Sequence, residues 1–480
     1  MHRLRCAVQN YEWGLPGASS AVARLHHASS PADIQARLPY AELWMGTHPS
    51  GPSHIQAGAA ADSPWTPLQA HLTAHPSALG PAGLYSAESA LPFLLKVLSV
   101  GKALSVQAHP DRELAARLHA ARPDLYKDAN HKPEMAIALT PFEAMCSFRA
   151  PGDLAARLRA TPELRALAGA GPSDALLAAA DAMGPAAGEA AGSSSSSGGG
   201  GFRAALQAWY AALMAAPPAE AAQQAARLGA RLEAQGEGSP AAAAAAASAP
   251  PPVEGPSACG AYELLRPDAI AARLLAQYPG DIGVFAPYFL NTLRLPPGGA
   301  LFLGSGEPHA YLAGDCIEVM ACSDNVVRAG LTPKFKDTAT LVGMLTYSCT
   351  GRPAVTAGAA LPPPAPRTRL YTSPVPEFQV QATRLPCTCS ACPEAQRGGA
   401  ETLPGSAAPS ILIVVEGGGS AAAGGADAPR VRLAPGDVWF VPAGLQLTLF
   451  QEDAPCPSPG AHAPCLRVYR AMANDAGGSH

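Results

Sequence analysis

Three polar side chains alternate along the segment LSVQAHPD at residues 104–111, which has the composition of a β-strand that ends in a turn at Pro110. Ser105, Gln107 and His109 are spaced two residues apart, so a strand directs all three side chains to one face. A strand normally turns an apolar face towards the core. A hydroxyl, an amide and an imidazole on one face therefore mark a candidate polar site.

Further ligands for a divalent metal lie downstream. Glu134 opens an apolar run after YKDANHKP, and His309 lies near the end of a strand in LFLGSGEPHAYL. With Gln107 and His109 they form a donor set that suits zinc, and the neutral amide favours a site with a position open to water or substrate. The alternative is structural, because an inward histidine is more often a hydrogen-bonded core residue, glutamine is a rare zinc ligand, and no compact motif such as HExxH is present.

Charged residues accompany these candidates. Lys132 and Glu134 are two residues apart and would share one face of a strand, and Glu318 follows His309. Arg328 and Lys334 lie in NVVRAGLTPK, where arginine could bind a phosphate through two hydrogen bonds. Surface charge would explain any one of these residues. A metal, a lysine able to act as a base and an anion pocket together favour chemistry on a phosphorylated small molecule.

The elements that must position these residues fall into three regions. Residues 1–150 contain short strand-like runs such as FLLKVLSV, and residues 151–275 have Ala, Leu and Arg at helical spacing. Strands return at residues 276–360, and a Pro-rich segment then leads into further strands at 361–480. The pattern predicts a mainly β fold with a helical insert, in a sandwich or barrel architecture.

Three segments carry no prediction of a site. Two low-complexity stretches, at about 184–201 and 235–257, lack the hydrophobic pattern of a core and are expected to form loops. The thiols of CTCSAC at residues 387–392 have no second Cys or His pair at zinc-finger spacing close by. An incidental thiol cluster is therefore expected there in preference to a structural zinc site.

The composition excludes several classes of protein. The chain has 480 residues, a formal net charge of −4 and no cluster of basic residues, which argues against nucleic-acid binding. Its 11 irregularly spaced cysteines favour reduced thiols. It has neither an apolar run of the roughly 18 residues that a membrane span needs nor a secretory h-region. We expect a cytoplasmic protein of two to three domains, with no membrane or nucleic-acid partner.

Long, ordered motifs along the chain resemble those of the type I phosphomannose isomerases, zinc enzymes of the cupin superfamily. The motifs are VQNYEWG, ELWMGTHPSGPS, LPFLLKVLSVGKALSVQAHPD, YKDANHKPEMAIAL, GDIGVFAPYFLN, EPHAYLAGDCIEVMACSDNVVRAGLTPKFKD and, more weakly, DVWFVPAG. The resemblance implies a cupin (jelly-roll) catalytic domain at residues 1–150 and 276–360, an α-helical domain at 151–275, and a second, metal-free cupin-like β domain at 361–480.

The resemblance also implies roles for individual residues. One zinc ion (Zn²⁺) per chain would be bound by Gln107, His109, Glu134 and His309. Catalytic roles fall on Arg328, Lys132, Glu318 and His131, the last as the group that opens the sugar ring. The residues expected to bind the substrate, at its phosphate end or along the pocket wall, are Lys96, Ser105, Lys334, Tyr311 and Trp13.

The implied reaction interconverts mannose 6-phosphate and fructose 6-phosphate through a cis-enediol, an intramolecular oxidoreduction (aldose–ketose isomerisation) that feeds GDP-mannose synthesis. It requires ring opening, proton transfer between C2 and C1, and a grip on the phosphate. The identity of the base stays open between Lys132, Glu318 and a zinc-bound water. The alternative function is a metal-binding cupin of another kind, either an oxygenase, against which Gln107 argues, or a non-catalytic sugar-phosphate binding protein. The family implies a monomer.

Overall fold

The computed structural model describes most of the chain. The described residues are 1–30, 33–56, 63–81, 91–183, 197–236, 253–256, 262–349, 351, 353–386, 399–451 and 466–474. The CTCSAC thiols and most of the two low-complexity stretches lie outside these residues, so the predictions made for them are not tested.

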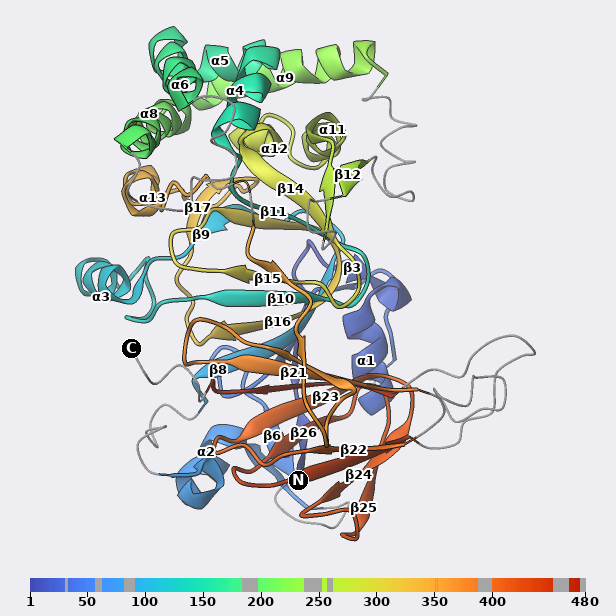
Figure 1. Cartoon of the computed structure of the whole chain (residues 1–480). Helices are drawn as coiled ribbons and strands as arrows, with labels where there is room; N and C mark the ends of the chain where they lie inside the picture. The colour runs from blue at the N-terminus through green and yellow to red at the C-terminus, as the bar shows by residue number, and fades with distance from the viewer. Residues whose placement is uncertain are drawn as a thin grey trace.

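Sheets form the middle and lower parts of the molecule in the view of Figure 1, and many of the helices gather at its upper end. Helices α4 (Pro151–Ala160) to α9 (Pro218–Ala234) lie at the top of the view, the strands around β16 (His309–Ala321) in the middle, and the C-terminal strands at the bottom. The prediction of a mainly β fold with a helical insert is confirmed. Within the part of the chain that the structure describes, each helix is too short or too polar to span a lipid bilayer.

The long strand β16 (His309–Ala321) organises the middle part of the molecule. Its first half pairs with β11 (Phe142–Phe148) and β9 (Val106–Ala108), and its second half pairs with β10 (Glu134–Ala138) and β8 (Phe93–Val100). Gly314 separates the two halves with a φ of +104°, and a Cβ there would lie 2.5 Å from the carbonyl oxygen of Pro141. Only glycine fits this bend without strain.

The other strands of this 13-stranded sheet extend it on both sides of β16. They are β2 (Ala7–Gln9), β5 (Glu42–Met45), β12 (Val253–Pro256), β13 (Glu263–Leu265), β14 (Leu290–Leu295), β15 (Ala300–Leu303), β17 (Val327–Gly330) and β18 (Val355–Thr356). The short strands β3 (Leu15–Pro16) and β4 (Pro39–Tyr40) pair separately.

The helical part supports the back of the strands that carry candidate site residues. Its helices are α4 (Pro151–Ala160), α5 (Pro162–Ala168), α6 (Ala170–Met183), α8 (Ser197–Met214), α9 (Pro218–Ala234) and α11 (Pro267–Gln277). Proline stands in the first turn of α4, α5, α9 and α11, where its missing N–H costs no hydrogen bond. Val106, Ala108, Val327 and Ala329 belong to the same apolar core as these helices. Alternation along the strands therefore directs their intervening residues, such as Gln107, to the opposite face.

The C-terminal strands form two further sheets that enclose a core of their own. A nine-stranded sheet contains β19 (Ala359–Ala360), β20 (Thr368–Tyr371), β21 (Gln379–Leu385), β28 (Leu466–Met472), β23 (Ser410–Glu416), β26 (Val438–Val441), β1 (His2–Arg5), β6 (His54–Gln56) and β7 (Trp65–Pro67). A four-stranded sheet contains β22 (Ala400–Leu403), β27 (Leu447–Gln451), β24 (Gly419–Ala423) and β25 (Arg430–Leu433). Leu412 and Val414 point into the core between them, whereas Ile411 and Ile413 pack in a core shared with β8 and β10.

Strands from the first 67 residues thus belong to the C-terminal sheet, since β1 pairs with both β26 and β6. The domain boundaries predicted from the sequence stay a prediction. The pairing of β1 assigns the first strand to the C-terminal sheet and not to the sheet around β16.

The remaining helical elements connect the strands. They are η1 (Gly17–Ser19), α1 (Ala21–Ser29), α2 (Leu68–Ala74), η2 (Pro76–Leu79), α3 (Arg112–Ala121), η3 (Ile282–Phe285), α12 (Ala286–Phe289) and α13 (Thr338–Met344).

Candidate metal centre and substrate cavity

Four residues from three separate segments of the chain meet where β9 and β10 lie beside β16. The ligand atoms of His109, Glu134 and His309 lie within 4.8 Å of one another, and all three side chains are buried. Nε2 of His109 is 3.4 Å from Oε1 of Glu134, and Nε2 of His309 is 3.3 Å from Oε2 of Glu134. Gln107 is the cross-strand partner of His309, with its Nε2 3.5 Å from the imidazole Nε2.

Backbone carbonyl groups orient both imidazoles. Nδ1 of His109 lies 2.7 Å from the carbonyl oxygen of Asn325, and Nδ1 of His309 lies 2.9 Å from that of Glu307. A carbonyl only accepts hydrogen bonds, so each Nδ1 carries the proton and each Nε2 has a free lone pair. Such a second partner on the far nitrogen is typical of histidines that bind metals.

The charge state of the cluster suits a cation. Burial lowers the pKa of His109 to about 4, so its imidazole is neutral at pH 7. Burial acts to raise the pKa of Glu134, but Lys132 and His109 outweigh it and hold that pKa well below its usual range. Nε2 of His109 and Oε2 of Glu134 are buried without a hydrogen-bond partner in the described structure. Buried polar atoms are normally paired, so these orphaned donor atoms fit a metal ion that would complete them.

Glu134 and Gln107 line a cavity of about 550 Å³, whereas His109 and His309 contact Glu134 but are not among the residues that line it. Of the residues predicted from the sequence, those that line it are Gln107, Glu134, Lys132, Glu318, Arg328, Lys96, Ser105, Lys334, Tyr311 and Trp13. Ser105 donates a hydrogen bond of 3.1 Å to Oε1 of Gln107, which explains the polar face of β9. In this orientation the amide turns Oε1 to Ser105 and Nε2 to His309, and a flip of the amide would present Oε1, its metal-binding atom, to the cluster.

Lys96 is held between two carboxylates inside this cavity. Its Nζ lies 3.0 Å from Glu318 and 3.2 Å from Glu42, and Trp44 also donates a hydrogen bond to Glu42. Burial acts to lower the pKa of Lys96, but the two carboxylates outweigh it and raise that pKa. Burial raises the pKa of Glu318, against the opposing effect of Lys96. The positive charge of Lys96 is thus neutralised by carboxylates of the protein itself.

Three other cations on the cavity wall lack an acidic partner among the described residues. Arg328 is the cross-strand partner of Gln107 on β17, and burial lowers its pKa. Lys334 lies in the loop after β17, and Lys102 packs over the ring of Tyr278 at 4.2 Å. These side chains can meet an anionic group on a ligand.

His131 does not line this cavity in the structure. Its Nε2 lies 2.8 Å from Glu377, which belongs to the C-terminal part of the chain, and 2.8 Å from Arg112. The adjacent residue Lys132 points the other way, with its Nζ 2.9 Å from Glu134. Neighbouring residues in an extended segment face opposite sides, so only one of this pair can reach the metal cluster.

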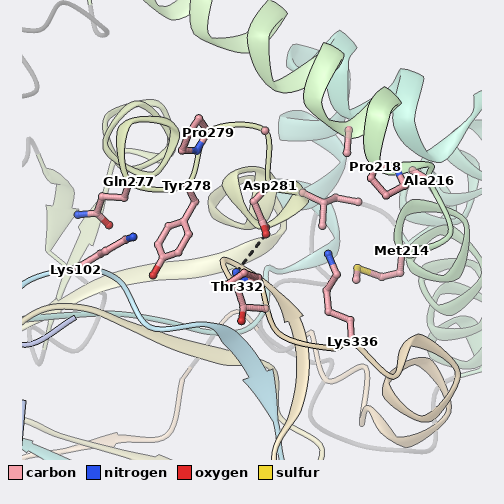
Figure 2. A pocket seen from close by; sticks show the side chains of 14 residues that line it. Lys102, Met214, Ala216, Pro218, Gln277, Tyr278, Pro279, Asp281, Thr332 and Lys336 are labelled. Atoms are coloured by element: carbon pink, nitrogen blue, oxygen red, sulfur yellow. Dashed lines mark hydrogen bonds between the residues drawn. The ribbon is translucent and has the colours of Figure 1, made fainter. Parts of the chain in front are cut away.

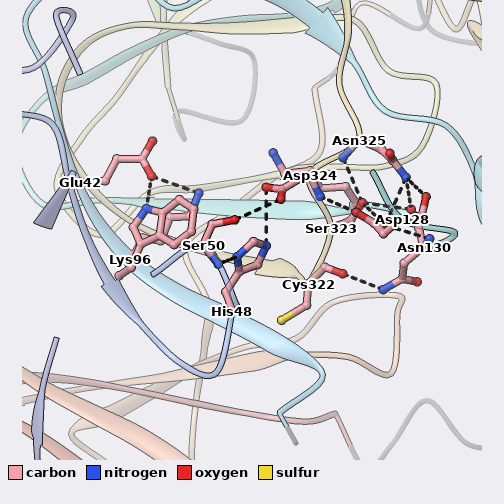
Figure 3. Close-up of polar contacts among 12 residues, drawn as sticks. Glu42, His48, Ser50, Lys96, Asp128, Asn130, Cys322, Ser323, Asp324 and Asn325 are labelled. Atoms are coloured by element: carbon pink, nitrogen blue, oxygen red, sulfur yellow. Dashed lines mark hydrogen bonds and ion pairs between the residues drawn. The ribbon is translucent and has the colours of Figure 1, made fainter. Parts of the chain in front are cut away.

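Reasoning from the sequence missed a histidine on the cavity wall. His48 is buried, and its Nε2 lies 3.5 Å from Oδ1 of Asp324 (Figure 3). Ser50 donates its backbone N–H to Nδ1 of His48 at 3.2 Å. Glu42, Trp44 and Lys102 were also missed. Glu42 and Trp44 alternate on one strand, a signal of the same kind as that of Ser105 and Gln107.

The loop that carries Asp324 is fixed from behind. Ser323 donates a hydrogen bond to Asp128, as does the backbone N–H of Asp324, both at 2.8 Å. Asn325 donates to the carbonyl oxygen of Asp128 at 2.7 Å, and Figure 3 shows these contacts converging on Asp128. The same Asn325 supplies the carbonyl that orients His109. The loop therefore couples the histidine of the metal cluster to the acidic partner of His48.

A second cavity, of about 640 Å³, lies beside the first (Figure 2). Lys102, Tyr278, Thr332 and Pro333 line both cavities. Asp281 also faces it, but its carboxylate accepts hydrogen bonds from the backbone N–H groups of Gly283, Leu331 and Thr332. The metal cluster meets the first cavity through Glu134, so that cavity is the candidate active site.

The sequence matches two family descriptions. Residues 1–151 match "Phosphomannose isomerase type I, catalytic domain", and residues 188–290 match "Phosphomannose isomerase type I, helical insertion domain". Among curated proteins, "Mannose-6-phosphate isomerase 2" of Arabidopsis thaliana is 37% identical over 456 residues, which is 94% of this chain and 91% of the relative. "Mannose-6-phosphate isomerase" of Homo sapiens is 38% identical over 388 residues, 80% of this chain and 82% of the relative.

Solved structures show the same fold. A crystal structure of a mutant phosphomannose isomerase from Salmonella typhimurium has a TM-score of 0.70 and 26% identity, covering 98% of this chain and 99% of that one. A structure titled "mannose 6-phosphate isomerase (holo; zinc bound)" has a TM-score of 0.68 and the same 26% identity, covering 98% and 99% of the two chains. The similarity extends over nearly the whole of each protein. This chain belongs to the type I phosphomannose isomerase family.

Proposed function

We propose that this chain is a zinc-dependent isomerase that interconverts mannose 6-phosphate and fructose 6-phosphate. One observation carries the proposal. The buried cluster of His109, Glu134 and His309 meets, through Glu134, a cavity that is also lined by Arg328, a cation that has no acidic partner among the described residues. A sugar phosphate would need the metal cluster at its reacting end and the cation at its phosphate.

Zinc would be held by Gln107, His109, Glu134 and His309. When bound, it supplies a Lewis acid that stabilises negative charge on the substrate oxygens. The chain's own contribution is to present two imidazoles in fixed orientations, since their Nδ1 atoms are tied to backbone carbonyls. Lys132 lies 2.9 Å from Oε1 of Glu134 and orients that carboxylate.

Arg328, Lys334 and Lys102 would grip the phosphate. Guanidinium groups bind phosphate oxygens in pairs, and Arg328 stands directly beside Gln107 in the strand register. Lys96 is a poorer anchor because Glu42 and Glu318 already neutralise it. Binding energy at the phosphate would then hold C1 and C2 near the metal cluster.

Glu318 would move the proton between C2 and C1 through a cis-enediol. A general base works best when its pKa lies near the working pH, and burial raises the pKa of Glu318 towards that range. Lys132 is less suitable, since an ammonium paired with Glu134 has no lone pair to accept a proton. Ring opening falls to His48 and Asp324, which face the same cavity, and not to His131. The resemblance of the chain to its family adds that the activity would feed GDP-mannose synthesis.

A coupled assay of mannose 6-phosphate conversion tests the proposal. We expect turnover that is lost after chelation and returns with zinc, and no bound zinc in His309→Ala and Gln107→Ala proteins that remain folded. A folded, zinc-loaded wild-type protein without turnover on this substrate would favour a binding protein instead.

A further inference from the structure

We infer that Glu377, in the C-terminal part of the chain, is a positioning residue for the metal centre. Its carboxylate lies where two parts of the molecule meet, and its side chain is only 8% exposed. It accepts hydrogen bonds from Arg112 and, at 2.8 Å, from Nε2 of His131. This inference rests on the metal site proposed above.

The two partners of Glu377 lie next to the segments that carry candidate metal ligands. Arg112 is three residues after His109 and is the first residue of α3, which follows β9 directly. His131 is three residues before Glu134, at the entrance to β10. One carboxylate therefore ties together the two segments that supply three of the four candidate ligands, and it also fixes the residue next to Lys132.

The loop that presents Glu377 is built as a rigid support. Ser373 donates its hydroxyl to the carbonyl oxygen of Val375, and the side chain of Asn474 donates to that of Ser373 at 2.7 Å. The backbone N–H of Asn474 donates to the carbonyl oxygen of Pro376 at 2.9 Å. The next residue, Phe378, is fully buried in the core shared by the two parts of the molecule. The end of the chain thus holds this loop in place against β9 and β10.

The hydrogen bonding of Glu377 is incomplete in a way that fold stability alone does not explain. Its Oε2 is buried and has no hydrogen-bond partner in the described structure. A buried carboxylate oxygen without a partner costs free energy, and such costs are typical of functional positions. Outer partners of this kind, which act through the residues that hold metal ligands, commonly change metal affinity by about 10- to 100-fold.

The test compares Glu377→Gln with Glu401→Gln. Glu401 is a matched control because it is buried in the same part of the chain and accepts hydrogen bonds there from Arg367 and Thr368. Zinc affinity is measured by competition with a chelator, the ligand field by the absorption spectrum of the cobalt-substituted protein, and stability by thermal unfolding.

We expect about a 10-fold loss of zinc affinity and an altered cobalt spectrum in Glu377→Gln, with a lower kcat and little change in KM. Glu377→Asp should recover part of the affinity, and Glu401→Gln should change stability alone. Wild-type zinc affinity and cobalt spectrum in Glu377→Gln would overturn the inference, even if its melting temperature fell.

If Glu377→Gln does not fold, Arg112→Ala removes the exposed half of the contact, since that side chain is 60% exposed. A several-fold loss of zinc affinity is expected, and unchanged affinity would again overturn the inference. Failure of the proposed function looks different, because wild-type protein would then bind no zinc, or would bind zinc without converting mannose 6-phosphate.

Discussion

Lys96 and Arg328 both line the candidate active site, but only Lys96 has acidic partners there among the described residues, so the two side chains have different roles. Lys96 contacts Glu42 and Glu318, which raise its pKa and neutralise its charge. Arg328 is half-buried beside Gln107 without an acidic partner among the described residues, and burial lowers its pKa. An unpaired buried cation is costly to keep unless a ligand supplies the missing charge. The unpaired arginine is therefore the better mark of where a substrate anion binds.

Replacing Arg328 by methionine should raise KM for mannose 6-phosphate by about 10- to 100-fold, the equivalent of one or two charged hydrogen bonds. Steady-state kinetics measures this change. Lys336→Met is the control, because Lys336 lines the neighbouring cavity and not the candidate active site. Equal effects from both variants would indicate that only the general positive charge of the surface matters.

Glu318→Gln should lower kcat by about 100- to 10,000-fold, as expected for the loss of a general base, while zinc content stays at the wild-type level. Exchange of the C2 proton with deuterated water, followed by NMR, should slow to the same degree. Lys132→Met should instead reduce zinc content, since Lys132 contacts a ligand and Glu318 does not. A Glu318→Gln enzyme with near-normal exchange would rule out the base assignment.

How far single residues could be predicted depended on the distance to their partners. Alternation within one strand was enough to mark Gln107 and His109, the donor types of Glu134 and His309 made them further candidates, and the resemblance assigned all four to one zinc ion. The direction of His131 was not predictable, because its acidic partner lies 246 residues away. The pairing of Lys96 with Glu318, across 222 residues, was hidden for the same reason.

At the scale of elements, β16 is one strand that pairs with two different groups of strands along its length. Gly314 lets it leave β11 and β9 and continue beside β10 and β8, so that one strand carries both His309, which contacts Glu134, and Glu318, which lines the cavity. The regular pattern of apolar residues predicted strands here, but not the bend. A single glycine in a strand indicates a bulge or a close approach without saying which.

Gly314→Ala should destabilise the protein by about 1–3 kcal/mol, because the new Cβ would lie 2.5 Å from the carbonyl oxygen of Pro141. Urea unfolding measures the difference in free energy. Gly152→Ala is the matched control, since that glycine is in helix α4 and has no atom within 4 Å of the added Cβ. The control should be neutral or stabilising by up to about 1 kcal/mol. Equal stability of both variants would show that β16 tolerates a side chain at its bend.

At the scale of the whole molecule, the catalytic and C-terminal parts share an apolar core and the charged contact of Glu377 with Arg112 and His131, and both affect stability. Burial acts to raise the pKa of Glu377, but His131 and Arg112 outweigh it and hold that pKa below its usual value. A carboxylate with a depressed pKa stabilises the fold at pH values above the pKa of the unfolded chain, about 4.3. This contribution is lost as the pH falls through the lower pKa of the folded state.

The difference in free energy of unfolding between wild type and Glu377→Gln should therefore be about 1.5–3 kcal/mol at pH 7 and should shrink as the pH falls below about 4. Denaturant unfolding at several pH values measures it. Both proteins should be compared without metal, so that zinc binding does not contribute. A difference that stays constant down to pH 2 would show that the carboxylate charge is not involved.

The arrangement of parts was predictable from composition, since strand-rich and helix-rich stretches alternate along the chain. The identity of the strands that close each sheet was not. Residues 2–5 look like an ordinary first strand of the N-terminal region, but the structure pairs them with Val438–Val441. No local pattern specifies a partner at the other end of a chain.

This pairing has a consequence for how the protein is made. Leu4 cannot pair with Val438 until the ribosome has added 434 more residues. At about 5–20 residues per second, this synthesis takes roughly 20 to 90 s. During that time the first strand has no neighbour on the side that β26 will occupy. A premature stop before codon 438 would remove β26 and leave this edge permanently open, and open strand edges recruit other chains. Nonsense changes upstream of that codon should therefore yield aggregates, and not shorter isomerases.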